Sequence, residues 1–319
     1  MRIVVTGCAG FIGSHLCEKL LEQEENTVIG IDCFIGPTPG SLKDLNISKL
    51  LPHPRFKLIK KSIMNIDCAD LLQKADIVYH LAGIPGVRAS WGKDFFPYTE
   101  NNILATQRLL EAAKSVVSLK KFIYASTSSI YGYKHGMVPE DAMPDPLSPY
   151  GVTKLAGEHL CSVYHQNFEV PVTILRYFTV YGPRQRPDMA FHRFFNQILT
   201  DQPLTLFGDG TQSRDFTYID DCVKGTAAVM NAENTIGKIF NIGGKERAAI
   251  HEIISEIEKI AGKKAVIRYL DAATGEPKHT HADISHAAKV LGYSPDISLR
   301  EGLIKEFDYM KVILKGESP

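Results

Sequence analysis

The segment Gly7-Cys8-Ala9-Gly10-Phe11-Ile12-Gly13 decides the fold of this chain. It follows residues 2–6, a short β-branched stretch that predicts a buried strand, and it leads into an apolar helix pattern that begins near Leu16. Glycines at this spacing in a strand-to-helix turn let the backbone approach a pyrophosphate, which lies at the N-terminus of the helix. The segment therefore predicts a dinucleotide site in an α/β protein.

A carboxylate follows the second predicted strand. Residues 27–31 form this strand, and Asp32 ends it. An acid at this place accepts hydrogen bonds from the adenosine ribose and repels a 2′-phosphate. We therefore expect NAD rather than NADP as the cofactor.

Strand and helix patterns alternate up to residue 177, which is typical of a doubly wound parallel sheet, the Rossmann fold. Further strands are predicted at residues 56–60, 76–83, 121–126 and 172–176, and helices at 98–117, 250–261 and 298–314. We expect residues 1–177 to form the NAD-binding domain, with a returning segment near 214–243. Residues 178–319 are expected to form mainly a smaller, mixed α/β substrate domain.

Composition excludes several classes of protein. The 319 residues are 44% hydrophobic, and 36 basic residues balance 36 acidic ones, so no charge favours nucleic acid or a membrane surface. No apolar run reaches the roughly 18 residues of a membrane span, and the first strand leaves no room for a signal peptide. The six cysteines lack a C-x-x-C pair and the histidines are scattered, so we expect buried thiols in the cytoplasm and no metal.

Tyr150 and Lys154 share one face of a predicted helix, which Ser148 caps and Pro149 begins. A positive charge within about 4–6 Å lowers the pKa of a phenol, and the helix dipole acts in the same direction. The pair therefore predicts a general base that works near neutral pH.

Ligands of an open α/β sheet lie outside the carboxyl ends of the strands. Five segments follow such ends and are expected to line one rim: residues 7–13, Asp32, residues 81–83, residues 126–129 and residues 177–179. The helix of Tyr150 follows the fifth strand and can face the same rim, so the hydroxyl-rich turn Ser126-Thr127-Ser128-Ser129 should lie close to Tyr150.

The chain resembles the extended short-chain dehydrogenase/reductases, and within them the NAD-dependent sugar-nucleotide epimerases and dehydratases. The resemblance runs from the first strand to residues 282–285, and its motifs are the glycine turn, Ser126–Gly132, Tyr150-x3-Lys154 and Arg214–Asp221. It implies a bound NAD that oxidises the C4 hydroxyl of the sugar to a ketone. Tyr150 would take the hydroxyl proton, Lys154 would hold the nicotinamide ribose, and Thr127 would bind the reacting oxygen.

The same resemblance implies two sets of binding residues. The set expected to line the cofactor is Gly7, Gly10, Phe11, Ile12, Gly13, Asp32, Ser62, Ile63, Leu81, Ala82, Gly83, Asn102, Ser126, Tyr150, Lys154 and Tyr177. The set expected to bind the substrate is Thr127, Ser128, Ser129, Tyr150, Thr179, Arg186, Arg214 and Glu276, the last two at the nucleotide. Arg88 is a weaker candidate for the sugar end, and a strictly structural Ser126 is equally compatible with the pattern.

Ser128 and Ser129 discriminate between reactions. Relatives that dehydrate the sugar usually carry Asp-Glu at this place, and relatives that decarboxylate a glucuronate carry Ser-Glu. Because a hydroxyl is a poor proton carrier at neutral pH, elimination lacks its catalyst here. This leaves 4-epimerisation, in which the ketone turns over and takes the hydride back on its other face.

Arg186 points to an acidic sugar. A guanidinium can bind a C6 carboxylate with two parallel hydrogen bonds, and Thr179 with the hydroxyl turn can add donors without an opposing carboxylate. Along its whole length the chain is similar to bacterial UDP-glucuronic acid 4-epimerases, which interconvert UDP-glucuronic and UDP-galacturonic acid. A UDP-glucose/UDP-galactose 4-epimerase, a UDP-glucuronate decarboxylase and a noncatalytic NAD-binding scaffold stay open as alternatives. Related enzymes pair through the helices near 98–117 and 150–167, so we expect a homodimer.

Overall fold

A computed structural model of the chain describes residues 1–272 and 274–316. Its centre is a seven-stranded sheet in the order β10-β6-β5-β4-β1-β2-β3, and each strand is parallel to its neighbours. The strands are β1 (Arg2–Thr6), β2 (Thr27–Ile31), β3 (Phe56–Ile59), β4 (Ile77–His80), β5 (Lys121–Thr127), β6 (Val172–Tyr177) and β10 (Lys238–Ile242). Strands β1 to β6 have the order of the dinucleotide-binding fold, so the predicted fold class is confirmed.

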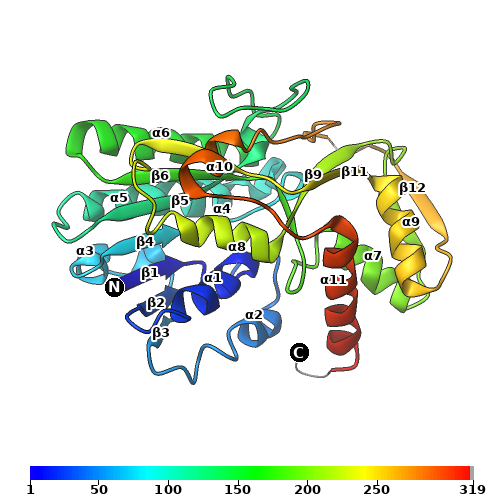
Figure 1. Cartoon of the computed structure of the whole chain (residues 1–319), viewed down its shortest axis with the longest axis horizontal. Helices are drawn as coiled ribbons and strands as arrows, with labels where there is room; N and C mark the ends of the chain where they lie inside the picture. Colours follow the sequence, from blue (N-terminus) through cyan, green and yellow to red (C-terminus); the bar gives the residue numbers. More distant parts are fainter. Residues whose placement is uncertain (273, 317–319) are drawn as a thin grey trace.

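Helices cover both faces of this sheet (Figure 1). On one face α1 (Phe11–Leu21) packs against α8 (Ile219–Ala228), and on the other lie α3 (Cys68–Leu72), α5 (Ala105–Ala113) and α6 (Pro149–Phe168). Because each face is covered, a central strand such as β4 is buried at every residue. Two separate apolar cores result, one on each side of the sheet.

The helix predicted at residues 98–117 is present as one uninterrupted helical run over 96–113, which ends four residues early and contains a π-helical segment. The structure has the short α4 (Phe96–Tyr98), a π-helical segment (Thr99–Leu104) and then α5, which ends at Ala113. The stretch after Ala113 contains Ser115, Val116 and Val117, all of low helix propensity, and the chain turns there. Widened π-helical turns occur frequently at functional sites, and this one carries Asn102.

A smaller group of elements lies beside the carboxyl end of the main sheet (Figure 1). It contains the sheet β11-β9-β7 and the pair β12-β8. The strands are β7 (Thr179–Tyr181), β8 (Leu204–Phe207), β9 (Ser213–Tyr218), β11 (Glu246–Ala249) and β12 (Ile267–Leu270), and the helices are α7 (Ala190–Leu199), α9 (Ile250–Ala261) and α11 (Leu299–Leu314). A capping box of Ser298 and Glu301 is present at the start of α11.

Two further α-helices lie in the described part of the chain. Helix α2 (Gly40–Asn46) follows β2, and α10 (Ser285–Leu291) packs on β10 and α8. None of the described helices is long and apolar enough to cross a bilayer. The six cysteines are unpaired, five of them buried and Cys33 partly exposed. Within residues 1–272 and 274–316, acids, histidines and thiols do not gather into a group that could hold a metal ion.

Candidate active site

In the glycine turn, residues 7–13, the backbone lies very close to other backbone segments of the fold. Gly7 has a φ of +74°, in the left-handed region, and its N–H donates to the Ile31 carbonyl at 2.7 Å. A Cβ on Gly13 would lie 2.1 Å from the Gly7 oxygen, so this position must be glycine. Helix α1 is capped by Gly10, whose missing side chain leaves the first helical N–H groups for a ligand. This turn fits a pyrophosphate.

Asp32 is buried and forms an ion pair that the sequence did not predict. Its Oδ1 accepts from Lys43 Nζ of α2 at 2.9 Å, and its Oδ2 accepts from the Ala9 N–H of the glycine turn at 3.1 Å. The carboxylate therefore fixes the turn while a buried cation lies where the adenosine ribose is expected. Lys43 comes eleven residues after Asp32, and nothing local in the sequence connects the two.

Asn102 joins the segment after β4 to helix α6. Its Oδ1 accepts from the Ile84 N–H at 2.7 Å, and its Nδ2 donates to the Ile84 carbonyl and to Thr153 Oγ1, each at 3.0 Å. A Cβ on Gly83 would lie 2.8 Å from Asn102 Oδ1, so glycine is needed for this approach. Because the amide is already engaged, a contact of Asn102 with the cofactor stays a prediction.

The other candidates for the cofactor site differ in how available their side chains are. Leu81 and Ala82 follow β4 directly against Gly7, whose added Cβ would lie 2.9 Å from the Ala82 nitrogen. Ser62 caps a short helical turn by accepting from the Met64 N–H, and Ile63 is in the apolar core. The Tyr177 hydroxyl pairs with Thr226 of α8 at 2.9 Å, so its contact with the cofactor also stays a prediction.

Helix α6 begins where the sequence predicts. The Ser148 hydroxyl accepts from the Gly151 N–H at 3.1 Å, and Pro149 is the first helical residue. Tyr150 is in the first turn, and the buried Lys154 is in the next. The Lys154 ammonium lies over the ring of Tyr124, 4.2 Å from its centroid.

The prediction that Lys154 lowers the pKa of Tyr150 is wrong for this arrangement. Burial raises the pKa of Tyr150, and the opposing influences are the Arg186 guanidinium and a hydrogen bond with Thr127. Desolvation outweighs both, because the charged phenolate loses its hydration in the buried site. The positive charge that acts on the phenol in this structure is that of Arg186.

A buried polar network lies behind Lys154. Burial lowers the pKa of Lys154 to about 8, and Cys161 and Glu158 oppose this shift. Glu158 accepts from the Ser126 hydroxyl and forms an ion pair with Arg176, whose Nη2 is 2.7 Å from Oε2. Ser126 therefore has its proton committed to Glu158, which favours its structural role. Glu158 was missed, although its position one turn after Lys154 is visible in the sequence.

The hydroxyl turn lies at the ends of two adjacent strands. Thr127 ends β5 and pairs with Tyr177 at the end of β6. Its Oγ1 accepts from the Ser129 N–H at 3.1 Å and contacts Ser129 Oγ at 3.2 Å, which fixes the turn. Thr179 starts β7 shortly after β6 ends, so three strand termini converge at this place.

Arg186 has an opposing carboxylate, which corrects the expectation of a pocket without one. Its Nε and Nη2 each lie 3.0 Å from an oxygen of Asp188, in a bidentate pair. This pair holds the pKa of Asp188 below its ordinary value although burial acts the other way. Asp188 was missed because it follows Arg186 by two residues and carries no motif of its own.

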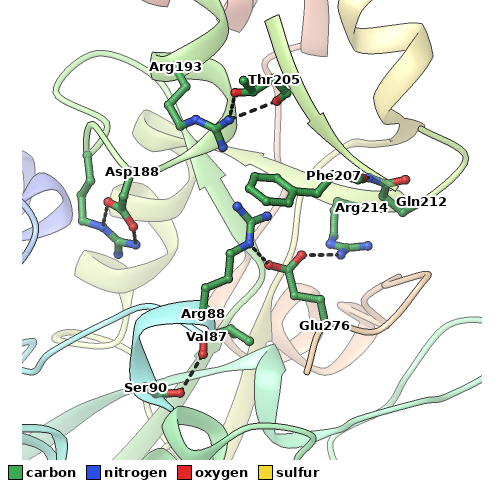
Figure 2. A network of polar contacts seen from close by, with 11 residues as sticks. Val87, Arg88, Ser90, Asp188, Arg193, Thr205, Phe207, Gln212, Arg214 and Glu276 are labelled. Carbon is green, nitrogen blue, oxygen red and sulfur yellow. Dashed lines mark hydrogen bonds and ion pairs between the residues drawn. The ribbon is translucent and has the colours of Figure 1, made fainter. Parts of the chain in front are cut away.

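Glu276 lies between Arg88 and Arg214 in a cluster of arginines that also contains Arg193 (Figure 2). Glu276 accepts from Arg88 Nε at 2.8 Å and pairs with Arg214 Nη2 at 3.3 Å. Arg88 stacks on the ring of Phe207, 4.0 Å from its centroid, and Arg193 donates to the Thr205 carbonyl at 3.0 Å. Two guanidinium groups thus meet one carboxylate, and Arg193 lies near the same Phe207 ring, 5.4 Å from its centroid. Arg193 was not predicted as a site residue. Arg88 was only a weaker candidate, and the structure places it in contact with both Glu276 and Phe207.

The fold and these side chains together have the features of a short-chain dehydrogenase/reductase. A model of the NAD dependent epimerase/dehydratase family matches residues 3–243, which is most of the chain. This protein belongs to the NAD dependent epimerase/dehydratase family, as its sequence motifs predicted.

Within this family, the chain is similar to several proteins named as epimerases of UDP-sugars. One similar solved structure is UDP-glucuronic acid 4-epimerase from Bacillus cereus in complex with UDP-glucuronic acid and NAD, to which the chain is 61% identical. The two structures superpose with a TM-score of 0.97, and the match covers 98% of this chain and 100% of that one. It is 40% identical to UDP-glucuronate 4-epimerase of Thermodesulfobacterium geofontis over 97% of this chain and 95% of the relative. It is 56% identical to the uncharacterized UDP-glucose epimerase YtcB of Bacillus subtilis, over 99% of this chain and 100% of the relative.

Proposed function

We propose that this protein is an NAD-dependent 4-epimerase that interconverts UDP-glucuronic acid and UDP-galacturonic acid through a 4-keto intermediate. One arrangement carries the proposal: helix α6, which carries Tyr150 in its first turn, packs against the hydroxyl turn, where a Cβ on Gly151 would lie 2.8 Å from the Ser129 carbonyl oxygen, and the charge of Arg186 acts on the phenol. A general base and a group suited to a carboxylate therefore share one pocket. The names of the relatives from Bacillus cereus and Thermodesulfobacterium geofontis agree with this proposal.

The residues of the rim fit NAD. The glycine turn of residues 7–13 would hold the pyrophosphate, Asp32 the adenosine ribose, and Lys154 the nicotinamide ribose. When bound, NAD supplies reversible acceptance of a hydride from C4 of the sugar. Tyr150 takes the proton of the C4 hydroxyl as a general base, while Thr127 holds the same oxygen by a hydrogen bond. The Arg186 charge and the Thr127 hydroxyl favour the phenolate of Tyr150 against the effect of burial.

Arg186 and the hydroxyl turn decide what happens to the ketone. The oxidised sugar is a β-keto acid, which loses carbon dioxide when the breaking bond aligns with the ketone π-system. Arg186, Thr179 and the hydroxyls of Ser128 and Ser129 would hold the carboxylate near the ring plane and so suppress this loss. Because Ser128 and Ser129 supply no carboxyl group for acid or base catalysis, elimination is not supported either.

The arginine cluster suits the UDP part of the substrate. Arg88, Arg193 and Arg214 exceed the charge of Glu276, and guanidinium groups bind phosphate oxygens in a bidentate manner. The ring of Phe207, at the end of β8, offers an apolar surface for the base. We infer that a diphosphate displaces Glu276 from at least one of its arginines.

A 4-epimerase of UDP-glucose and UDP-galactose is the second candidate. The uncharacterized relative from Bacillus subtilis carries a UDP-glucose name, and Asp188 already neutralises Arg186 in the pocket. The two functions are separated by incubating pure protein and NAD with UDP-glucuronate and with UDP-glucose, and by resolving the products by chromatography. We expect UDP-galacturonate to form faster than UDP-galactose. Faster conversion of UDP-glucose would overturn the uronate proposal, and release of carbon dioxide as the main outcome would favour a decarboxylase.

We also infer a homodimer in the cytoplasm. Leu104, Val163 and Phe168 on or near α5 and α6 are 48%, 50% and 51% exposed, which is an apolar face suited to a second copy. Tyr164, by contrast, is buried and bonded to Glu111, so it is not available for pairing. Light scattering after gel filtration should give twice the mass of the chain. Six unpaired cysteines agree with a reducing compartment.

A further inference from the structure

Helix α11 carries a buried acid that the proposed chemistry does not use. Glu306 is 1% exposed, and its Oε2 accepts from the Gly182 N–H at 2.8 Å. Its Oε1 has no hydrogen-bond partner among residues 1–272 and 274–316. A buried polar group of this kind costs stability, so its presence calls for a physical reason.

The surroundings of Glu306 contain phenols on three elements. Tyr181 of β7, Tyr218 of β9 and Tyr309 of α11 all feel the charge of Glu306, and each has a pKa above its ordinary value. Burial likewise raises the pKa of Glu306 well above its usual range. One oxygen of this buried carboxyl group accepts from a single backbone N–H, that of Gly182.

The turn that begins at Gly182 contains a residue in an unfavourable backbone conformation. Gly182 has a φ of +132°, and an added Cβ would lie 2.7 Å from Ile219 Cγ2. Two residues later Arg184 has a φ of +67°, which is uncommon for a residue with a side chain. Such conformations persist where the surrounding structure imposes them, and they cluster at functional sites. The strained turn leads directly to Arg186.

The same turn is fastened to the helix that begins at the glycine loop. The Pro183 carbonyl accepts from His15 Nε2 of α1 at 3.0 Å, and Arg184 Nη2 pairs with Glu18 Oε1 of α1 at 2.7 Å. Burial lowers the pKa of His15 to about 3, so the ring is neutral and donates from one nitrogen. Helix α11 thus binds the turn at Gly182, and helix α1 binds it at Pro183 and Arg184. Arg186 follows two residues after Arg184.

We propose that Glu306 is a positioning residue for Arg186, acting through the Gly182 N–H to hold the strained turn that presents the guanidinium to the sugar carboxylate. This inference rests on the proposed function, since it assigns Arg186 to a uronate. It adds a specificity element outside the pocket, on the helix at the end of the described chain. Removing the acceptor would release the turn at its first residue and let Arg186 leave its place beside Tyr150.

The test compares E306M, which keeps the volume but removes the acceptor, with E306Q, which keeps an amide oxygen for Gly182. Titration calorimetry of each protein measures the affinity for UDP-glucuronate, for UDP and for NAD. We expect E306M to bind UDP-glucuronate about tenfold more weakly, as expected for one lost buried hydrogen bond. Its affinities for UDP and for NAD should be unchanged, and E306Q should bind all three ligands like the natural protein.

Two results would overturn the inference. One is an E306M protein that binds UDP-glucuronate as tightly as the natural protein. The other is an equal loss for all three ligands, which would show general damage to the fold. If E306M does not fold, E306D is tested by the same titrations. Its side chain is one methylene shorter, so the acceptor is withdrawn from the Gly182 N–H, and the same results are expected from it. Failure of the proposed function is recognised separately, because the unsubstituted protein would then bind UDP-glucuronate no more tightly than UDP-glucose.

Discussion

Arg186 and Asp188 form a bidentate ion pair two residues apart, with both N–O distances at 3.0 Å. The guanidinium that is proposed to bind the substrate carboxylate therefore already has a carboxylate partner within the protein. The internal partner keeps Arg186 ordered and prevents an unpaired charge in a partly buried site. A uronate must exchange with Asp188, whereas a neutral sugar leaves the pair intact.

Substitution R186A should impair catalysis selectively. We expect kcat/KM for UDP-glucuronate to fall by about a hundredfold, the cost of one buried charge-assisted contact, and any activity on UDP-glucose to change little. The matched control is R268A, because Arg268 is an exposed arginine on β12. Steady-state kinetics on both sugars checks the prediction, and an equal loss on both would contradict the assignment of Arg186 to the carboxylate.

Substitution D188N should make the Arg186 guanidinium available to the substrate carboxylate. If Asp188 competes with the substrate carboxylate, D188N lowers KM for UDP-glucuronate about threefold to tenfold, which corresponds to roughly 1 kcal/mol. Initial-rate measurements over a range of UDP-glucuronate concentrations give this value. A higher KM would show instead that Asp188 orients Arg186 rather than competing for it.

Much of this site follows from the sequence, because its main parts are local. The glycine turn, the cap of Ser148 and the Tyr150–Lys154 spacing each depend on a few consecutive residues, and the structure has all three. The direction of the Tyr150 pKa shift was not predictable, since it depends on burial and on Arg186, both set by tertiary packing. The π-helical segment around Asn102 and the end of the helix at Ala113 were not predicted either.

Partners that are distant in sequence could not be predicted. Lys43 reaches Asp32 from α2, and Glu306 reaches Gly182 across 124 residues. Neither contact leaves a local pattern, because an isolated lysine or glutamate on a helix is normally at the surface. The burial of both side chains, at 7% and 1% exposed, is visible only in the folded chain.

The pair of Asp32 and Lys43 makes a prediction about cofactor choice. Removing the carboxylate in D32S leaves the buried Lys43 cation beside the expected ribose, where it can bind a 2′-phosphate. We expect D32S to gain affinity for NADP, measured by fluorescence titration, and to lose affinity for NAD. The double variant D32S/K43M is the control and should lose the gain. NADP binding that is equally strong without Lys43 would contradict this account.

Lys154 makes a prediction about stability and pH. Its folded pKa of about 8 lies below the ordinary value of 10.5, so the folded protein releases this proton more readily than the unfolded chain. The charge therefore destabilises the fold fully below about pH 8, and this cost fades as the pH rises toward the unfolded pKa. K154M should raise Tm at pH 7, with a gain that shrinks between pH 8 and 10. A gain that grows with pH would contradict the sign.

The measurement that tests the central claim most directly follows the C4 hydrogen of the substrate. UDP-glucuronate deuterated at C4 is incubated with the protein and NAD in ordinary water, and the products are analysed by NMR and mass spectrometry. A 4-epimerase that oxidises C4 and returns the same hydride on the other face predicts UDP-galacturonate with deuterium retained at C4. Loss of the deuterium to solvent, release of carbon dioxide as the main product, or unchanged substrate would each contradict the account.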